Sequence, residues 1–467
     1  MSGLIITFTR SRYHRMLVLV LVGMLITSML LAGMLSRSGP RVRIVTMNKE
    51  VQLSRGTSIT LAFDRPLEKK DYKAEVSLNP AVPLETSVKG KSLIVSIQAN
   101  LLQNTHYELK VNPEIYDTSG HKMAKTYTYA FISASARYMY VRRDYEMDTH
   151  TIDKKDDILF LADLTGATTE LFHVKRIRMF RANRQYAVVV SDEGGSDVLY
   201  TINIKTKAVR RYPLDIQGEV RDLELSPLGT IALFSVQPEF RPDDPEYFDT
   251  YAYRLQALDI ASGNAYLVND GSGDALKVET IAVNNDGQYA LIKDVKRSFF
   301  IVSPYNDFAP VLLGIHARSH GFDADSKTIL FEDEGTISSY DISTSTATVR
   351  PMQDIILGVD ESRGSIFAQV AEYSNGVYAT KIKRSPSWSA PFETVWEPSG
   401  FTDKNLVRAF YASYDQRFIA VQLNTENCQF DDYGTSSECE DVSMILYDTK
   451  DKKELGTIKG FGLVWLP

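Results

Sequence analysis

Short segments in which apolar and polar residues alternate dominate this chain, and the pattern predicts β-strands. From about residue 136 onward one unit recurs: an inner apolar strand, a turn with Gly or Asp, two further strands and a fourth after a small turn. The inner strands are predicted near Arg176, Val220, Val278 and His316, and in IILGVDESRG (355–364), LVRAFYASYD (406–415) and GLVWLP (462–467). Their spacing of about 48 residues is that of four-stranded propeller blades.

The turn between the third and fourth strands also repeats, with small and polar residues at a fixed place. The five copies are ADLTGATTELF (162–172), INIKTKAVRRY (202–212), LDIASGNAYLV (258–268), YDISTSTATVR (340–350) and YDTKDKKELGT (447–457). This internal repetition is the strongest organisational signal in the sequence.

The two ends of this region complement each other. Residues 138–174 provide a blade without an inner strand, and GFGLVWLP (460–467) provides an inner strand without a blade. Joining them would complete a seventh blade and leave neither strand edge unpaired, with Trp465 packed between blades. Residues 136–467 therefore resemble seven-bladed β-propellers of the bacterial WD40-like or lactonase-like architecture. The G-H…W-D signature of WD40 repeats is missing, so the resemblance transfers no function.

Residues 41–134 predict a separate β-sandwich, with turn signals every 8–12 residues. Its predicted strands lie in TSITLAFDRPL (57–67), AEVSLNP (74–80), SLIVSI (92–97), HYELKV (106–111) and YTYAFIS (127–133). These segments, with LLQNTHYELKV and IYDTSGHKM, resemble the bacterial Ig-like domain of the S-layer and cell-surface type. The resemblance implies a spacer or adhesive module and carries no catalytic residues. Tyr107 should bury its ring and hydrogen-bond nearby backbone, while Asp64 and Asp117 suit turns better than calcium.

One N-terminal segment predicts a membrane anchor. Met16 to Leu35 contain no charged residue, and 20 helical residues span the roughly 30 Å hydrocarbon core. We expect a short cytoplasmic tail (1–15) and a transmembrane signal-anchor helix (16–35). A cleaved signal peptide is the alternative, but the apolar run is too long and lacks a clear cleavage site.

Arginines flank this segment on both sides, so the positive-inside rule does not decide its orientation. A short N-terminal tail, the folded mass after the helix and a closely spaced cysteine pair favour an extracytoplasmic C-terminal region. The chain has no N-x-S/T sequon, which favours a bacterial envelope.

Charge and motifs narrow the function classes. After residue 36 the chain carries 49 basic against 59 acidic side chains, a formal charge of −10, which argues against nucleic-acid binding. H-E-x-x-H, CxxC, Walker and G-x-S-x-G motifs do not occur. His316 and His320 lie near an inner strand and could face a central channel, but turn or packing roles fit them better.

Three long insertions stand out where the second and third strands of a blade connect: 144–156, 238–250 and 424–441. Blades one and seven are neighbours in a closed ring, so all three should rise on one face, and long loops on a rigid scaffold commonly carry binding. The candidate binding face comprises Asp144, Glu146, Asp148, His150, Asp243, Asp244, Tyr247, Phe248, Asp249, Phe430, Asp431, Asp432 and Tyr433. The alternative is that they are ordinary solvated loops. Exposed aromatics suit a protein or glycan partner. We expect no cofactor, although the oxygen ligands leave calcium open.

Cys428 and Cys439, the only cysteines, lie in the last of these insertions. No histidine accompanies them, which disfavours zinc, and the surrounding carboxylates would raise a thiol pKa, which disfavours a redox pair. We expect a disulfide that closes a loop of about 12 residues and stiffens the insertion.

The fold class expected is thus all-β with one N-terminal transmembrane helix. The leading hypothesis is a non-enzymatic, membrane-anchored scaffold that presents a loop-rich propeller face to a surface protein or glycan. The rival is an envelope propeller hydrolase or lyase with carboxylates at the channel mouth. A third option is an envelope-assembly scaffold whose partner lies in the membrane. Convergent desolvated carboxylates with a His or a cation would favour the enzyme.

Overall fold

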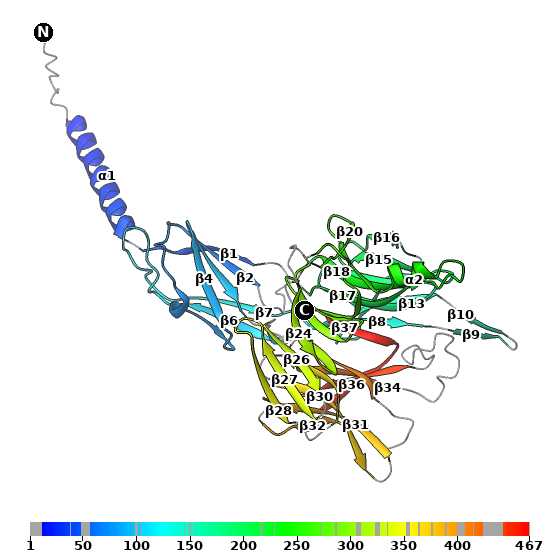
Figure 1. Cartoon of the computed structure of the whole chain (residues 1–467). Coiled ribbons are helices and arrows are strands. Elements are labelled where there is room, and N and C mark those ends of the chain that lie inside the picture. Colours follow the sequence, from blue (N-terminus) through cyan, green and yellow to red (C-terminus); the bar gives the residue numbers. More distant parts are fainter. Residues whose placement is uncertain are drawn as a thin grey trace, which may run out of the picture. The chain divides into compact units, whose positions relative to one another are not determined.

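The structure is a computed structural model of the whole chain, shown in Figure 1. It describes residues 12–37, 39–47, 57–98, 101–103, 105–143, 145–148, 151–154, 156–214, 216, 218–227, 229–270, 272–284, 287–304, 310–322, 327–333, 335–351, 355–362, 365–374, 377–387, 390–398, 407–413, 415–423 and 442–466. The chain divides into two compact units, residues 1–134 and 135–467.

The N-terminal helix α1 covers Arg12–Arg37. The side chains of α1 are described from Met16 to Ser28, and the apolar ones among them are exposed. Within the described part of the chain, no helix reaches the length and apolarity needed to cross a membrane. The anchor predicted at 16–35 extends past the described side chains and stays a prediction.

Seven strands in two sheets form the rest of the first unit. One sheet has the order β1-β2-β5-β4 and the other β3-β6-β7. The strands are β1 (Val42–Met47), β2 (Ser58–Phe63), β3 (Val76–Asn79), β4 (Leu84–Lys89), β5 (Ser92–Ile97), β6 (His106–Val111) and β7 (Tyr127–Ile132), with a 3₁₀ turn η1 (Lys73–Glu75) before β3. The sequence patterns predicted five of them but missed β1 and β4, which are the edge strands of their sheet.

A single core lies between these two sheets. The inward residues of β2, β5 and β6 are fully buried, in the strict alternation that the sequence shows. Tyr107 on β6 is completely buried, and its hydroxyl accepts a hydrogen bond from the Leu102 N–H at 2.8 Å. The predicted role of Tyr107 is confirmed.

Asp117 takes the expected turn role, whereas Asp64 bonds a residue 23 positions earlier in the chain. The Asp117 carboxylate accepts from the N–H groups of Ser119 and His121, both at 2.9 Å. Asp64 accepts from the Arg41 N–H at 2.8 Å. The two Asp117 bonds stabilise the turn at residues 117–121.

The second unit contains seven four-stranded antiparallel sheets among its described residues, coloured from cyan to red in Figure 1. Each sheet is named here by its inner strand, and six follow chain order from inner to outer. They are β13–β16 (Ile177–Ala182, Tyr186–Asp192, Asp197–Asn203, Val209–Pro213), β17–β20 (Gly218–Leu225, Ile231–Pro238, Arg254–Asp259, Asn264–Leu267), β21–β24 (Val278–Val283, Ala290–Asp294, Ser298–Val302, Val311–Ile315), β25–β28 (Arg318–Phe322, Thr328–Asp333, Thr336–Asp341, Thr346–Pro351), β29–β32 (Ile355–Ser362, Ser365–Ser374, Val377–Ser385, Glu393–Trp396) and β33–β36 (Val407–Ala412, Phe418–Leu423, Ser443–Asp448, Lys453–Lys459). Inner strands thus lie where the repeat predicted them.

The seventh sheet joins the two ends of the unit. Its order is β37-β8-β11-β12, with β37 (Phe461–Leu466) paired antiparallel to β8 (Arg137–Arg142), followed by β11 (Asp157–Asp163) and β12 (Thr168–Val174). Trp465 on β37 is 4% exposed and lies edge-on to Tyr138, with its indole N–H donating to the Tyr411 carbonyl of β33 at 2.9 Å. The predicted packing of Trp465 between neighbouring sheets is confirmed.

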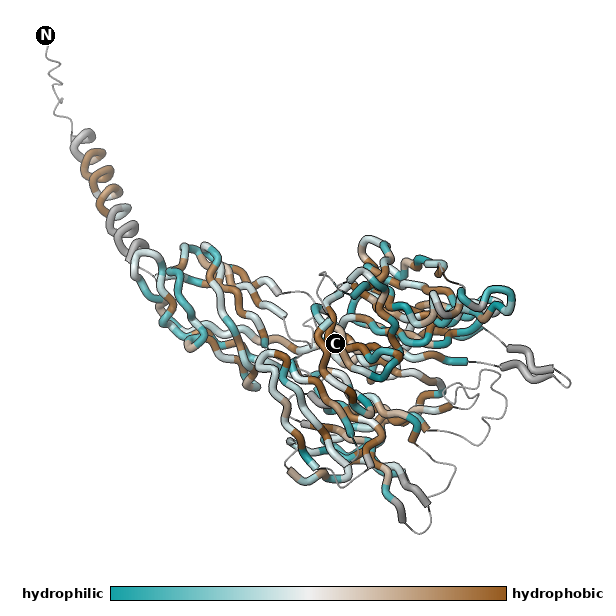
Figure 2. Tube along the Cα trace, viewed as in Figure 1, coloured by the Kyte–Doolittle hydropathy of each residue, from teal (hydrophilic) through white to brown (hydrophobic). Residues whose placement is uncertain are grey.

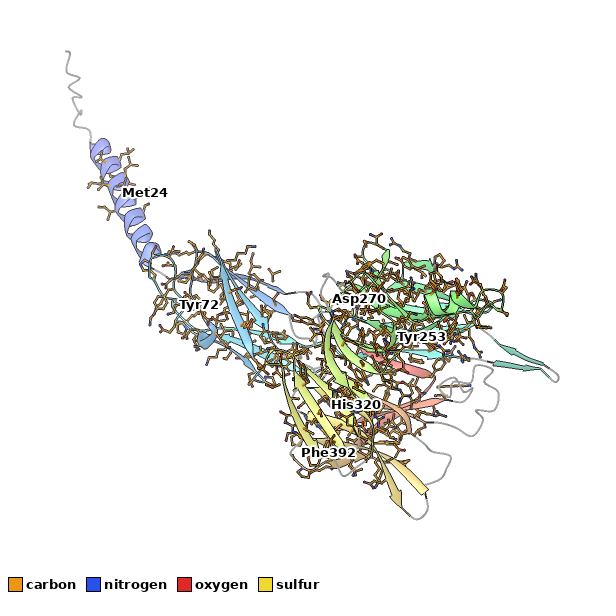
Figure 3. All side chains as sticks on the ribbon, in the orientation of Figure 1. Met24, Tyr72, Tyr253, Asp270, His320 and Phe392 are labelled. Carbon is orange, nitrogen blue, oxygen red and sulfur yellow. The ribbon has the colours of Figure 1, made fainter. Side chains whose placement is uncertain are left out.

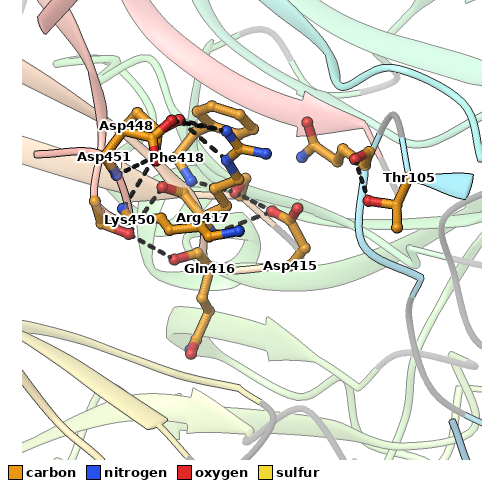
Figure 4. Close-up of polar contacts among 11 residues, drawn as sticks. Thr105, Asp415, Gln416, Arg417, Phe418, Asp448, Lys450 and Asp451 are labelled. Atoms are coloured by element: carbon orange, nitrogen blue, oxygen red, sulfur yellow. Dashed lines mark hydrogen bonds and ion pairs between the residues drawn. The ribbon is translucent and has the colours of Figure 1, made fainter. Parts of the chain in front are cut away.

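The repeated turns after the third strands share one construction. Asp163, Asn203, Asp259, Asp341 and Asp448 each accept backbone N–H bonds from residues two to four positions later. In the last copy Asp448 also binds the Arg417 guanidinium at 2.8 Å (Figure 4). Hydrophilic residues gather at these turns and hydrophobic residues along the strands (Figure 2).

Candidate functional site

The long insertions connect the second and third strands of their sheets, as predicted. The first lies between β8 and β11, the second between β18 and β19, and the third between β34 and β35. In each sheet this connection is at the end where the chain enters the inner strand, because consecutive strands are antiparallel. We call this end of the sheets the insertion rim.

The first insertion, expected as a long loop at 144–156, contains regular structure among its described residues. A hairpin forms there from β9 (Tyr145–Asp148) and β10 (Thr151–Lys154), with Asp148 paired to Thr151 and Glu146 to Asp153. The alternating sequence YEMDTHTIDK explains why strands form. Glu146 and Asp148 thus lie on β9, while Asp144 and His150 are outside the described residues.

The third insertion is not described beyond its flanking strands. Phe430, Asp431, Asp432, Tyr433, Cys428 and Cys439 lie outside the described residues. Their place in the binding face and the Cys428–Cys439 disulfide stay predictions.

The second insertion contains a helix where a loop was expected. Helix α2 covers Pro245–Tyr251, and the Asp244 carboxylate caps it by accepting from the Tyr247 N–H at 3.2 Å. Aspartate before proline at the first helical position is a strong start signal, which explains the difference. Asp249 lies within α2.

Aromatic and arginine side chains surround α2. Phe240 is 64% exposed and meets Phe248 edge-on, with 6.4 Å between ring centroids. The Arg241 guanidinium lies 4.1 Å from the Tyr247 ring centroid, and Tyr247 packs against Tyr251 at 4.8 Å. Such contacts hold an exposed aromatic surface in place at low entropic cost on binding.

The tyrosines of α2 also reach inward. Tyr247 and Tyr251 pack against the core between the β13 and β17 sheets. Tyr253, labelled in Figure 3, follows at a positive φ of 61° and contacts Gln237 through its hydroxyl at 3.3 Å. The insertion is therefore fixed to the sheets at its C-terminal end, while Phe240 faces solvent.

Acidic groups lie beside these aromatics. Glu239, Asp243, Asp244 and Glu246 are exposed. Of the predicted face, the structure brings Asp243, Asp244, Tyr247 and Phe248 together on one insertion. Among the described residues, this insertion included, no three His, Cys, Asp or Glu side chains are grouped closely enough to hold a metal ion.

A second polar cluster lies on the inner strands, and the sequence analysis missed it. Arg181 of β13 donates to the Glu224 carboxylate of β17 at 2.9 Å, and Asp222 accepts from the Ile281 N–H of β21 at 2.6 Å. Burial, reinforced by the Glu224 charge, raises the pKa of Asp222 to about 6. Charged residues inside the apolar strands RIRMFRA and VRDLEL were the available signal.

The two histidines near the β25 strand have packing roles. The His316 ring stacks on Phe331 at 4.1 Å and hydrogen-bonds Asp333 at 2.8 Å. His320, labelled in Figure 3, contacts Glu332 at 2.9 Å, and burial lowers the pKa of its imidazole despite that carboxylate. Among the described residues, neither histidine ring contacts Asp222.

Comparison with known proteins identifies one part of the chain by sequence. Residues 38–133 match the family model of a bacterial Ig-like domain. The resemblance predicted for the first unit is confirmed, and it suggests an extracellular or surface location. No curated protein sequence matches the chain.

Solved β-propellers resemble the chain in fold. A β-propeller domain from Myceliophteria thermophila shares 10% identity at a TM-score of 0.41, covering 61% of this chain and 87% of that one. A putative 6-phosphogluconolactonase from Bacteroides fragilis shares 10% at 0.43, covering 71% and 98%. A chain of the mitotic checkpoint complex shares 10% at 0.40, covering 57% and 78%. An Ig-like domain joined to a series of four-stranded sheets suggests a surface or binding scaffold.

Proposed function

We propose that this protein is a membrane-anchored, extracytoplasmic binding scaffold. In this proposal residues 1–15 are a cytoplasmic tail, residues 16–35 the anchor, residues 41–134 an Ig-like spacer, and residues 136–467 a seven-bladed propeller. The uncharged run from Met16 to Leu35 within α1 supports the anchor. The insertion rim is offered to a protein or glycan partner.

Contacts between inner strands support a closed propeller. β13 contacts β17, β17 contacts β21, and the series continues through β25, β29 and β33 to β37, which contacts β13 again. Because β37 pairs with β8, the sheet that contains the first and the last strand of this unit also has four strands. A closed ring has no free sheet edge at the channel and makes a rigid platform for insertions.

Side chains that reach from one sheet to the next inner strand support the same arrangement. The Asp157 carboxylate accepts from the Ile177 N–H at 2.7 Å, and Asp197 accepts from Val220 N–H at 2.6 Å. Each of these buried aspartates also pairs with an arginine, Arg143 or Arg178. Aspartates at the start of third strands thus tie successive sheets together.

The observation that carries the binding proposal is the α2 insertion. An exposed Phe240 meets Phe248 edge-on beside an acidic border, and Phe248 lies on a short capped helix that is packed onto the sheets. A rigid aromatic centre with a charged border is the composition of binding hot spots.

The enzymatic alternative would depend on the cluster around Asp222, whose raised pKa favours it. However, the two Asp222 oxygens accept from the N–H groups of Leu223 and Ile281. Both hydrogen bonds fix the position of the backbone. This structural role accounts for Asp222 without a catalytic one.

Quantitative co-purification tests the proposal. The full chain is cross-linked in its native cells, and partners recovered with wild type are compared with those of Phe240→Ala and of Val349→Ala, an outer-strand control that is 62% exposed. We expect Phe240→Ala to lower recovery of a specific protein or glycan at least tenfold while the control keeps it. Equal recovery with both variants, or turnover of a glycan or ester panel without any partner, contradicts the proposal.

A further inference from the structure

A small cavity lies between the β21 and β25 sheets, away from the α2 insertion. Its volume is about 160 Å³. Nine residues line it: Thr280, Ile281, Ala282, Leu291, Lys293, Phe299, Arg318, Ser319 and Gly321. An apolar cavity of about 150 Å³ accommodates a benzene ring, so this one has room for a small aromatic or branched aliphatic body.

Small residues and irregular strands create the space. Gly321 on β25, at φ +81°, faces Ala282 on β21, and a side chain at Gly321 would come within 3.6 Å of the Ala282 methyl group. Register shifts between Val278 and Thr280 and between Ser319 and Gly321 bend both strands here. Phe299 forms the apolar wall, braced edge-on by Phe331 at 5.2 Å.

The polar part of the lining is cationic. The Lys293 side chain is only 17% exposed, and its ammonium pairs with the Glu279 carboxylate at 3.0 Å. Glu279 is itself 49% exposed, so this partner lies toward solvent. An ammonium offers three donors, and one carboxylate occupies a single donor, which leaves donor capacity at the cavity wall.

Arg318 differs from Lys293 because its guanidinium is already committed. It forms two bonds to the Glu332 carboxylate, at 2.7 and 2.9 Å, and donates to the carbonyl of Ile356. Arg318 therefore contributes a fixed wall whose charge is balanced by Glu332, whereas Lys293 can bind a ligand directly. The Thr280 side chain adds a hydroxyl to the same lining.

We propose that this cavity binds a small monocarboxylate with an apolar body of about benzene size. The apolar body would occupy the space between Ala282, Leu291 and Phe299, and the carboxylate would meet Lys293 at the rim. This site is independent of the partner-binding face and neither requires nor supports it.

Titration of the purified full chain with sodium benzoate, followed by calorimetry, tests the inference. We expect saturable binding with a dissociation constant of about 1 mM or below. Lys293→Met, which keeps the side-chain length, should weaken binding at least tenfold, and Ala282→Leu should abolish it by filling the space. Lys296→Met, an exposed lysine on the same hairpin, should bind as wild type does.

Benzyl alcohol provides the neutral probe of the same size, and we expect it to bind at least tenfold more weakly than benzoate. Lack of saturation by about 10 mM benzoate overturns the inference. Unchanged affinity in Lys293→Met, or equal affinity for benzyl alcohol, also overturns it. If Ala282→Leu does not fold, the comparison of Lys293→Met with Lys296→Met still decides.

Discussion

Single side chains couple ionisation and hydrogen bonding to the stability of both units. Asp222 is the clearest case in the second unit, because it is partly buried, lies beside Glu224 and holds the backbone of the next inner strand. Its pKa of about 6 lies above the usual value near 4, so the folded state favours the protonated acid. Ionising Asp222 therefore costs folding free energy.

The upward shift of the Asp222 pKa predicts how the stability of the second unit depends on pH. The penalty is absent below about pH 4, grows as pH rises toward about 6, and is complete above it. Asp222→Asn removes it, so the free energy of unfolding of the variant relative to wild type should rise by about 1–3 kcal/mol from pH 4 to pH 7. Chemical denaturation of the second unit at both pH values measures this. An identical difference at the two values contradicts it.

In the Ig-like domain, Tyr107 gives a second residue-scale prediction. Tyr107→Phe removes the acceptor of the Leu102 N–H, so stability of this domain should fall by about 1 kcal/mol. Hydrogen exchange of peptides from 38–133, followed by mass spectrometry, reports the change. Tyr129→Phe removes a hydroxyl from neighbouring β7 and should have a smaller effect; the reverse order contradicts the role assigned to Tyr107.

The sequence predicts Tyr107 because its motif and strand corner are local. Asp222 and Asp197 could not be assigned in the same way, since their partners lie 59 and 23 residues further along the chain. Lys293 and Gly321 become neighbours only when two sheets pack. Side chains whose role depends on a distant inner strand carry no local pattern.

Among elements, the turns after the third strands repeat both sequence and conformation. One residue of each adopts positive φ: Gly166, Lys207, Gly263, Ser345 and Lys452. Glycine adopts this conformation without strain, whereas other residues lose about 1 kcal/mol or more. The repeat was predictable because turn chemistry is local, whereas β9, β10 and α2 were expected as loops because their signals are short.

A matched pair of variants tests the turn. Gly166→Ala, at φ +85° and with no neighbouring atom within 4 Å, should cost about 1–2 kcal/mol through the backbone alone. Lys207→Ala in the equivalent turn exchanges one L-residue for another and should be nearly neutral. Thermal denaturation of the two variants measures the difference, and equal stabilities are incompatible with this explanation.

The β37 strand allows a test of closure. Trp465→Ala removes a buried indole that packs against Tyr138 and bonds to Tyr411, so it should destabilise the second unit by about 3–5 kcal/mol. Leu455→Ala on outer strand β36, where the side chain is 42% exposed, serves as control and should cost less than about 1 kcal/mol. Denaturant unfolding distinguishes them. Similar losses in both variants contradict a closing role for β37.

At the scale of the whole molecule, we propose a spacer joined to a rigid platform whose insertions share one rim. The composition and the repeat predicted both β-rich units, and the Ig-like match confirms the first. The anchor extends past the described side chains of α1 and the cysteine pair lies outside the described residues, so both stay predictions from the sequence. The identity of the partner cannot be predicted from a local sequence pattern, because it depends on how separate insertions combine.

Site-specific photo-cross-linking in native cells tests whether the first and second insertions bind one partner. A photoreactive residue replaces Phe240 on the second insertion, Glu146 on the first, or Val349 on an outer strand, one at a time. We predict that the same partner is captured from positions 240 and 146 and is not captured from position 349. Capture of that partner from position 349 with equal yield, or unrelated adducts from 240 and 146, would contradict a binding face at the insertion rim.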